Sequence, residues 1–227
     1  MIRAVPTKGE DFHPVFKSKA ALAALIPLGL VACSTPNGQI TDTGITATRS
    51  ACPAVAIPAA TGDITLFNPE GSRDSSAIDV VANITNLRST CDESGANIVT
   101  RVTFDVQAQR RDGRGARQVV VPYFVVAVQG GNQVQSKSVG RVALSFADGQ
   151  LRAATSGSAT GQVTRAAVTL PEDVRQQITR RRKPGDPSAA IDPMADPAVR
   201  EAVRRASFEV LVGFQLTQDQ LAYNATR

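Results

Sequence analysis

The sequence has no tryptophan and a single histidine, His13. Residues 33–227 contain no histidine, so these residues cannot build a Ser-His-Asp triad, a Cys-His pair or a histidine metal centre. A phosphate-binding glycine loop, a catalytic serine motif and clustered carboxylates are also missing, and no helix is expected after Gly-Gly-Asn at 130–132. We therefore expect a protein that is not an enzyme and has no catalytic residues, cofactor or metal. Two carboxylates brought together by folding, as in a glycosidase, are the enzymatic alternative.

The N-terminus has an apolar run that is too short to cross a membrane. Residues 20–30, AALAALIPLGL, carry no charge and follow Arg3, Lys8, Lys17 and Lys19. A membrane-spanning helix needs about 20 apolar residues, whereas a basic segment before a shorter run is typical of a secretory signal. The alternative is a buried helix of a cytosolic domain.

Leu30, Val31, Ala32 and Cys33 complete this pattern, and they resemble the lipobox of bacterial lipoproteins. The resemblance implies a signal peptide at 1–32, cleavage before Cys33, diacylglycerol on the Cys33 thiol and a fatty acid on the new amino group. Two or more acyl chains attach a protein stably to a membrane without a transmembrane helix. Ser34 stands where inner-membrane lipoproteins of some bacteria carry Asp, which favours the periplasmic face of the outer membrane.

Cysteine is scarce, with three residues in the chain. If Cys33 is acylated, Cys52 and Cys91 remain, and an oxidising compartment favours a disulfide between them. A closed loop of about 40 residues would stabilise the fold by roughly 4 kcal/mol through the unfolded chain. Two separate free thiols are the alternative. The formal net charge of +5 is mild, and an exported chain rarely meets nucleic acid, so we expect no such ligand.

Period-two alternation of apolar and polar residues dominates the chain after its first quarter. Residues 98–109, 77–87 and 207–216 alternate in this way, which is typical of half-buried antiparallel strands. The sequence predicts an all-β, antiparallel β-sandwich over residues 54–227, immunoglobulin-like or transthyretin-like, with a small barrel as the alternative. The polar residues 33–53 have no such period and are expected to form a flexible tether. About seven or eight strands are expected, at 62–67, 77–89, 98–110, 117–128, 133–146, 150–155, 161–170 and 207–216.

Three short turn motifs separate the predicted strands. The segments 111–115, 130–132 and 147–150 are rich in Asp and Gly and predict hairpins between neighbouring strands. The run 119–128 is apolar on both faces, and Pro122 within it indicates a bulge or an edge position. Four arginines crowd the first turn and are interpreted as charged protection of a hairpin: Arg110, Arg111, Arg114 and Arg117.

One or two short helices are expected in an insertion at 171–206. Residues 170–178 and 198–206 have helix-starting signals and an apolar face. The loop 179–197 between them carries the densest charge run after the signal: Arg180, Arg181, Arg182 and Lys183. We expect these cations to contact an anionic surface or a partner, with a merely solvated loop as the alternative. The segment 215–227 is expected to pack back on the sandwich, the alternative being a peptide that docks a partner.

Together these features predict a lipid-anchored periplasmic lipoprotein of the cell envelope. We expect a non-enzymatic accessory, assembly or scaffold module, attached to the membrane through Cys33 and bound to a protein partner. The alternative is a binding protein for a small or lipidic ligand held in the sandwich.

Overall fold

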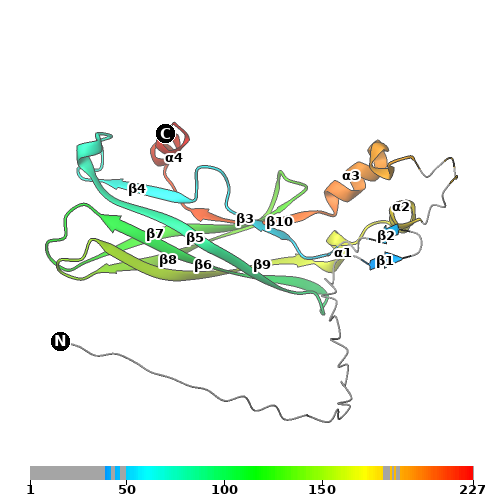
Figure 1. Ribbon diagram of the computed structural model, residues 1–227, viewed down its shortest axis with the longest axis horizontal. Helices are drawn as coiled ribbons and strands as arrows, with labels where there is room; N and C mark the ends of the chain where they lie inside the picture. Colours follow the sequence, from blue (N-terminus) through cyan, green and yellow to red (C-terminus); the bar gives the residue numbers. More distant parts are fainter. Residues whose placement is uncertain are drawn as a thin grey trace, which may run out of the picture. The chain divides into compact units, whose positions relative to one another are not determined.

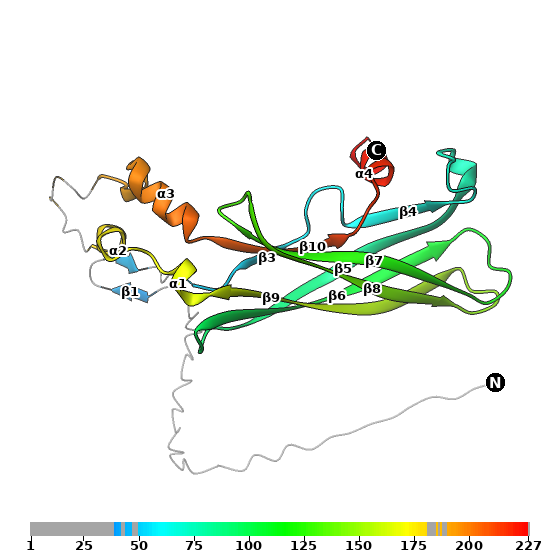
Figure 2. The same ribbon diagram turned by 180° about the vertical axis from the view of Figure 1, so that it is seen from behind.

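Two four-stranded sheets, here called sheet I and sheet II, stack face to face in the computed structural model (Figures 1 and 2). The structure describes residues 39–41, 44–46, 50–180, 185, 187 and 190–226. The strand order is β3-β10-β7-β8 in sheet I and β4-β5-β6-β9 in sheet II. The predicted all-β antiparallel sandwich is therefore confirmed over the residues described.

Most strands lie close to their predicted positions, but β3 was not predicted, and Arg165–Val168 of the predicted strand 161–170 form a helix instead. Sheet I contains β3 (Ala54–Ala56), β7 (Arg117–Gln129), β8 (Gln133–Phe146) and β10 (Phe208–Phe214). Sheet II contains β4 (Asp63–Phe67), β5 (Ile78–Asp92), β6 (Asn97–Arg110) and β9 (Arg152–Thr164). Neighbouring strands are antiparallel except β3 and β10, which are parallel. The predicted tether also contains a small hairpin of β1 (Gln39–Thr41) and β2 (Gly44–Thr46).

The core lies between the sheets, where the strands place every second side chain. On β6 the burial alternates from Ile98 to Ala108, as the sequence predicts. Phe104, Phe146 and Phe214 are among the largest fully buried side chains of the described residues. Each buried side chain of this size contributes about 1.5–3 kcal/mol of hydrophobic free energy, so the filled interior is the main source of stability.

Short helices follow β9 and end the chain. They are α1 (Arg165–Val168), α2 (Glu172–Thr179), α3 (Pro197–Arg205) and α4 (Gln218–Ala225), with a 3₁₀ turn η2 (Pro193–Ala195) before α3. Another 3₁₀ turn, η1 (Ser75–Ala77), lies between β4 and β5. The two helices predicted in the insertion are confirmed as α2 and α3, which share a small apolar cluster around Val174 and Val199. The start of α2 differs from the prediction, because Pro171 is its N-cap and the first helical residue is Glu172.

The C-terminal segment packs on the sandwich, as predicted, through α4. The Asn224 side chain donates hydrogen bonds to the carbonyls of Ala60 and Asp63 at 2.9 and 2.8 Å. The Tyr223 ring packs edge-on against Phe67 at 5.2 Å. Thr217 and Gln220 close a capping box at the start of the helix.

Two of the three predicted hairpins are wrong. Only residues 130–132 join paired strands, β7 and β8. Residues 111–116 run from β6 in sheet II to β7 in sheet I, and residues 147–151 run from β8 back to β9. Because sequence pattern does not say which sheet the next strand joins, a crossover between sheets and a hairpin look alike.

Pro122 lies in a central strand, neither at an edge nor in a bulge. The register shift of β7 against β8 falls between Ala127 and Val128. The Pro122 carbonyl accepts a hydrogen bond from the Gln215 N–H at 2.9 Å, just after β10 ends. An N–H at this position would point to the same side, toward β10, which ends at Phe214. The absence of an N–H in proline therefore breaks no hydrogen bond within the β7–β10 ladder.

Candidate functional site

The residues predicted as sites divide between those that the structure describes and those that it does not. Cys33 and the cations Arg181, Arg182 and Lys183 lie outside the described residues. Arg180 is described and is exposed at the C-cap of α2. Its contact with an anionic surface stays a prediction.

The predicted disulfide between Cys52 and Cys91 is confirmed. The two sulfur atoms are bonded, and the Cα atoms lie 6.1 Å apart. Cys52 precedes β3 of sheet I, whereas Cys91 belongs to β5 of sheet II. The bond therefore joins the two sheets at the end of the sandwich where β5 turns into β6.

Arg110 is not part of a charged hairpin tip, because its side chain is buried with 2% of the residue exposed. Its guanidinium donates to the carbonyls of Gln150, Gly115, Gly113 and Ala147 at 2.7, 2.8, 2.5 and 2.9 Å. It also lies over the Phe146 ring, 5.2 Å from the centroid. Arg110 thus ties the two crossover loops together, so its role is structural.

The other arginines of this group form surface contacts. Arg117 pairs with Asp79 at 3.0 Å, and Arg111 donates to the carbonyls of Ser75 and Ser76. Arg114 donates to Asp112, and this hydrogen bond lowers the pKa of the Asp112 carboxyl to about 2. Such exposed pairs stabilise a fold weakly and do not by themselves make a binding site.

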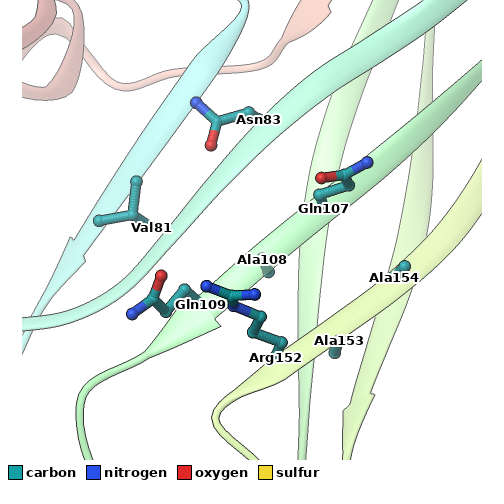
Figure 3. Close-up of a pocket in the computed structure, with 8 residues that line it drawn as sticks. All are labelled: Val81, Asn83, Gln107, Ala108, Gln109, Arg152, Ala153 and Ala154. Atoms are coloured by element: carbon teal, nitrogen blue, oxygen red, sulfur yellow. The ribbon is translucent and has the colours of Figure 1, made fainter.

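A shallow hollow of about 630 Å³ lies on the outer face of sheet II. Figure 3 shows the Gln109 amide and the Arg152 guanidinium close together, with Asn83 and Gln107 further along the same face. These side chains supply hydrogen-bond donors and acceptors, and the hollow has no carboxylate in its lining to transfer a proton. The complete lining is Val81, Asn83, Gln107, Ala108, Gln109, Arg152, Ala153 and Ala154.

Two carboxylates on exposed strand faces do not converge. Asp105 accepts hydrogen bonds from Asn86 and Ser156, each at 2.8 Å, and these bonds lower the pKa of its carboxyl. Glu209 lies on β10 of sheet I and alternates with the buried Phe208 and Val210, so it faces outward from the other sheet. Asp105 therefore has a structural hydrogen-bonding role, and these two residues do not form an acid pair.

One free edge of sheet I is formed by β8, and its residues 133–139 are here called the β8 edge. β8 pairs with β7 alone, and every residue of the β8 edge is exposed, on both faces of the strand. Val134 and Val139 are 64% and 57% exposed. A hollow of about 520 Å³ opens beside this edge, between Ser136–Ser138 of β8 and Thr160–Thr164 of β9.

The exposed valines continue onto the outer face of sheet I. Val134 pairs with Val128, and Val139 pairs with Phe124, whose neighbours on that face include Val126 and Leu211. Val120, further along β7, is 51% exposed. This surface, called the apolar outer face, explains why the run 119–128 is apolar on both sides. An apolar sheet face at the surface is typical of an interaction site.

Sequence reasoning missed the β8 edge because the spacing of its two exposed valines does not indicate a shared face. Val134 and Val139 are five positions apart, which places them on opposite faces of an unbroken strand. The register shift opposite Ala127 and Val128 inserts an extra residue and brings both onto one face.

The described residues contain no group of three His, Cys, Asp or Glu side chains placed to bind a metal ion. None of the described helices is long and apolar enough to span a membrane. No protein-family model, curated protein or solved structure matches the chain.

Proposed function

We propose that this chain is a lipid-anchored module of a bacterial cell envelope, held at the periplasmic face of the outer membrane, which acts by binding a partner protein. The observation that carries the proposal is the set of exposed valines on the outer face of sheet I and at its β8 edge. Val120, Val134 and Val139 are each more than half exposed there. A soluble domain rarely leaves such residues together at its surface without a partner.

The proposed lipid anchor would bring this surface close to its partner. Acylation of Cys33 confines the sandwich to one membrane, which raises the effective concentration of any partner in the same envelope. Arg180, Arg181, Arg182 and Lys183 would add contacts with an anionic surface, each worth about 1 kcal/mol close to anionic lipid. The module positions a partner and carries out no reaction.

A ligand held between the sheets is the alternative, and it would have to compete with the side chains already there. Phe104, Phe146 and Phe214 fill the described interior. One hollow described above lies on the outer face of sheet II, and the other opens beside the β8 edge and reaches Val125 and Ala127 on the inner face of β7. An interaction module needs no such rearrangement, and this supports the proposal.

The anchor is tested by growing cells with radiolabelled palmitate and isolating the protein. We expect label on the wild type and on the Cys52→Ser/Cys91→Ser double variant, and no label on Cys33→Ser. The double variant is the matched control, because it removes two cysteines and keeps the lipobox. Label on Cys33→Ser, or none on the wild type, would contradict the lipoprotein assignment.

The partner is tested by crosslinking in intact cells followed by purification from solubilised envelopes. We expect a defined protein with the wild type, and its loss in Val120→Ser/Val139→Ser. A control variant, Thr103→Ser/Gln107→Ser, makes two changes on the outer face of sheet II and should retain it. A third variant with Ser at the four cations of 180–183 measures whether they contribute. If no protein is captured with the wild type, the partner-binding function is wrong.

A further inference from the structure

We infer that the β8 edge receives an extended acidic segment of the partner protein as an added strand. This inference rests on the proposed function, because it specifies how the partner binds. Addition of a strand to a sheet edge uses main-chain hydrogen bonds for affinity and alternate side chains for specificity.

The backbone of the β8 edge is oriented for such pairing. The Gln215 N–H donates to the Pro122 carbonyl, so Pro122 is directed toward β10. Neighbouring residues of a strand alternate, which directs Val125 toward its partner Ser138 on β8. Ser138 therefore faces β7, whereas Lys137 and Val139 on either side of it direct their N–H and C=O groups to the free edge.

An added strand would also find room for its side chains. The hollow of about 520 Å³ lies between Ser136–Ser138 and Thr160–Thr164. Alternate side chains of the new strand would enter this hollow, whose lining combines serine, threonine and amide groups with the apolar side chains of Val125, Ala127 and Val163. The remaining side chains would lie beside Val134 and Val139 on the apolar outer face and bury them.

The charge of both edges selects an acidic partner. Neither β8 nor β9 contains an aspartate or glutamate, and together they carry Lys137, Arg141 and Arg152. Lys137 is exposed at the centre of the β8 edge, with its ammonium 5.4 Å from the Phe124 ring centroid on the outer face. A carboxylate on the incoming strand opposite Lys137 would form a cross-strand charge pair.

A second copy of this chain fits the same edge poorly. Two β8 edges that pair around a two-fold axis near their centre bring Lys137 close to its own counterpart. Like charges opposite each other destabilise a strand pair, and a bulge beside the edge disfavours regular pairing. The occupant is therefore an extended segment of another protein, about seven residues long, with a carboxylate near its middle.

Two synthetic peptides test the mode of binding on the purified full-length protein. The acidic probe is Thr-Thr-Val-Thr-Asp-Thr-Val-Thr-Thr, and its match has Lys in place of Asp. We expect the acidic peptide to bind at least tenfold more tightly in fluorescence anisotropy and to slow hydrogen exchange at residues 133–139. Lys137→Glu should reverse the preference. Equal binding of both peptides, or protection elsewhere only, would overturn the inference.

Two variants at one position separate the backbone from the side chain. Val139→Pro removes an N–H at the free edge and leaves Ser138 and Gly140 to pair with β7, whereas Val139→Ser keeps the N–H. We expect Val139→Pro to lose at least tenfold more affinity than Val139→Ser, with an unchanged circular dichroism spectrum. Equal losses would mean that the peptide binds the side-chain surface and adds no strand.

A photocrosslinking amino acid at Val139, compared with one at Thr103 on sheet II, separates this inference from the proposed function. A partner crosslinked from Val139 through an acidic segment supports the inference. A partner crosslinked only from Thr103 leaves the proposed function intact and overturns the strand addition. A second copy of the chain crosslinked from Val139 also overturns it. No crosslinked partner from either position counts against both.

Discussion

At the residue scale, Arg110 shows how a cation is held in the interior mainly by neutral groups. Four carbonyls from two crossover loops accept hydrogen bonds from its guanidinium. Arg110→Ala would remove the donor from these four carbonyls, at about 1–3 kcal/mol for each one that water cannot reach. We expect the free energy of unfolding to fall by about 3 kcal/mol or more in urea denaturation.

The control for Arg110→Ala is Arg114→Ala in the same loop. The Arg114 side chain is 91% exposed, so its removal should lower the free energy of unfolding much less than Arg110→Ala does. Similar losses in the two variants would show that Arg110 does not link the crossovers.

Asp112 provides a pH-dependent contact at the same scale. Its pKa is lowered from 3.8 to about 2, mainly by the hydrogen bond from the Arg114 guanidinium. A carboxyl with a lower pKa in the folded state stabilises the fold above its unfolded pKa, near 3.9, and loses this contribution as the pH falls toward about 2. A carbon-13 NMR titration should place the midpoint of Asp112 near 2.

Two variants check the cause of this shift. Arg114→Ala should raise the Asp112 midpoint toward 3.8. Arg111→Ala, which makes its contacts with Ser75 and Ser76 instead, should leave the midpoint near 2. A midpoint that does not respond to Arg114→Ala would contradict the assignment.

At the element scale, β9 depends on residues that have no side chain. Gly157 lies opposite Phe104 of β6, and a Cβ added there would overlap the Phe104 ring. We expect Gly157→Ala to lower the free energy of unfolding by about 1–3 kcal/mol, as overpacking does. Phe104→Leu should cost less in the Gly157→Ala background than in the wild type, a coupling that a double-mutant cycle in urea measures.

Gly95→Ala is the control for this prediction. Its added Cβ would lie 3.6 Å from the nearest atom, an ordinary contact in the turn between β5 and β6. Its free energy of unfolding should stay within about 0.5 kcal/mol of the wild type. Additive losses for Gly157→Ala and Phe104→Leu would show that the ring does not need the glycine.

The same glycines explain what the sequence pattern predicts and what it misses. β6 and β10 were predicted because β-branched and aromatic residues alternate with polar ones along them. β9 was predicted as two strands, 150–155 and 161–170, although it is one strand, Arg152–Thr164. Gly157 and Gly161 leave gaps in its alternation. Those gaps are filled by Phe104 and Val210 from other strands. Contacts between strands distant in sequence are not visible in a local period.

The candidate site was less predictable than the fold for a related reason. The apolar run 119–128 indicates a surface that needs covering, but not that its outer face stays open. Which strand ends at an edge depends on the order of all strands in the sheet. The bulge that gathers Val134 and Val139 depends on the pairing of β8 with β7. The arginines 110–117 looked alike in sequence, and only the fold separates the buried Arg110 from the others.

At the scale of the whole sandwich, the two sheets are joined differently at their two ends. Arg110 links the crossovers 111–116 and 147–151 at one end. The Cys52–Cys91 bond joins β5 to the segment before β3 at the other, close to where β5 turns into β6. The covalent link therefore acts at the end where no crossover of the long central strands holds the sheets together.

Removal of the disulfide should consequently destabilise the fold and loosen that end first. The bond closes a loop with a sequence separation of 39, which corresponds to roughly 4 kcal/mol in the chain-entropy account. We expect Cys52→Ser/Cys91→Ser to lower the free energy of unfolding by about 2–4 kcal/mol in urea, and wild type treated with a reductant to match it. Hydrogen exchange should accelerate around Thr90–Thr100 more than around the crossover at 111–116. If exchange rises equally at both ends, the disulfide acts only by restricting the unfolded chain and does not hold the sheets together locally.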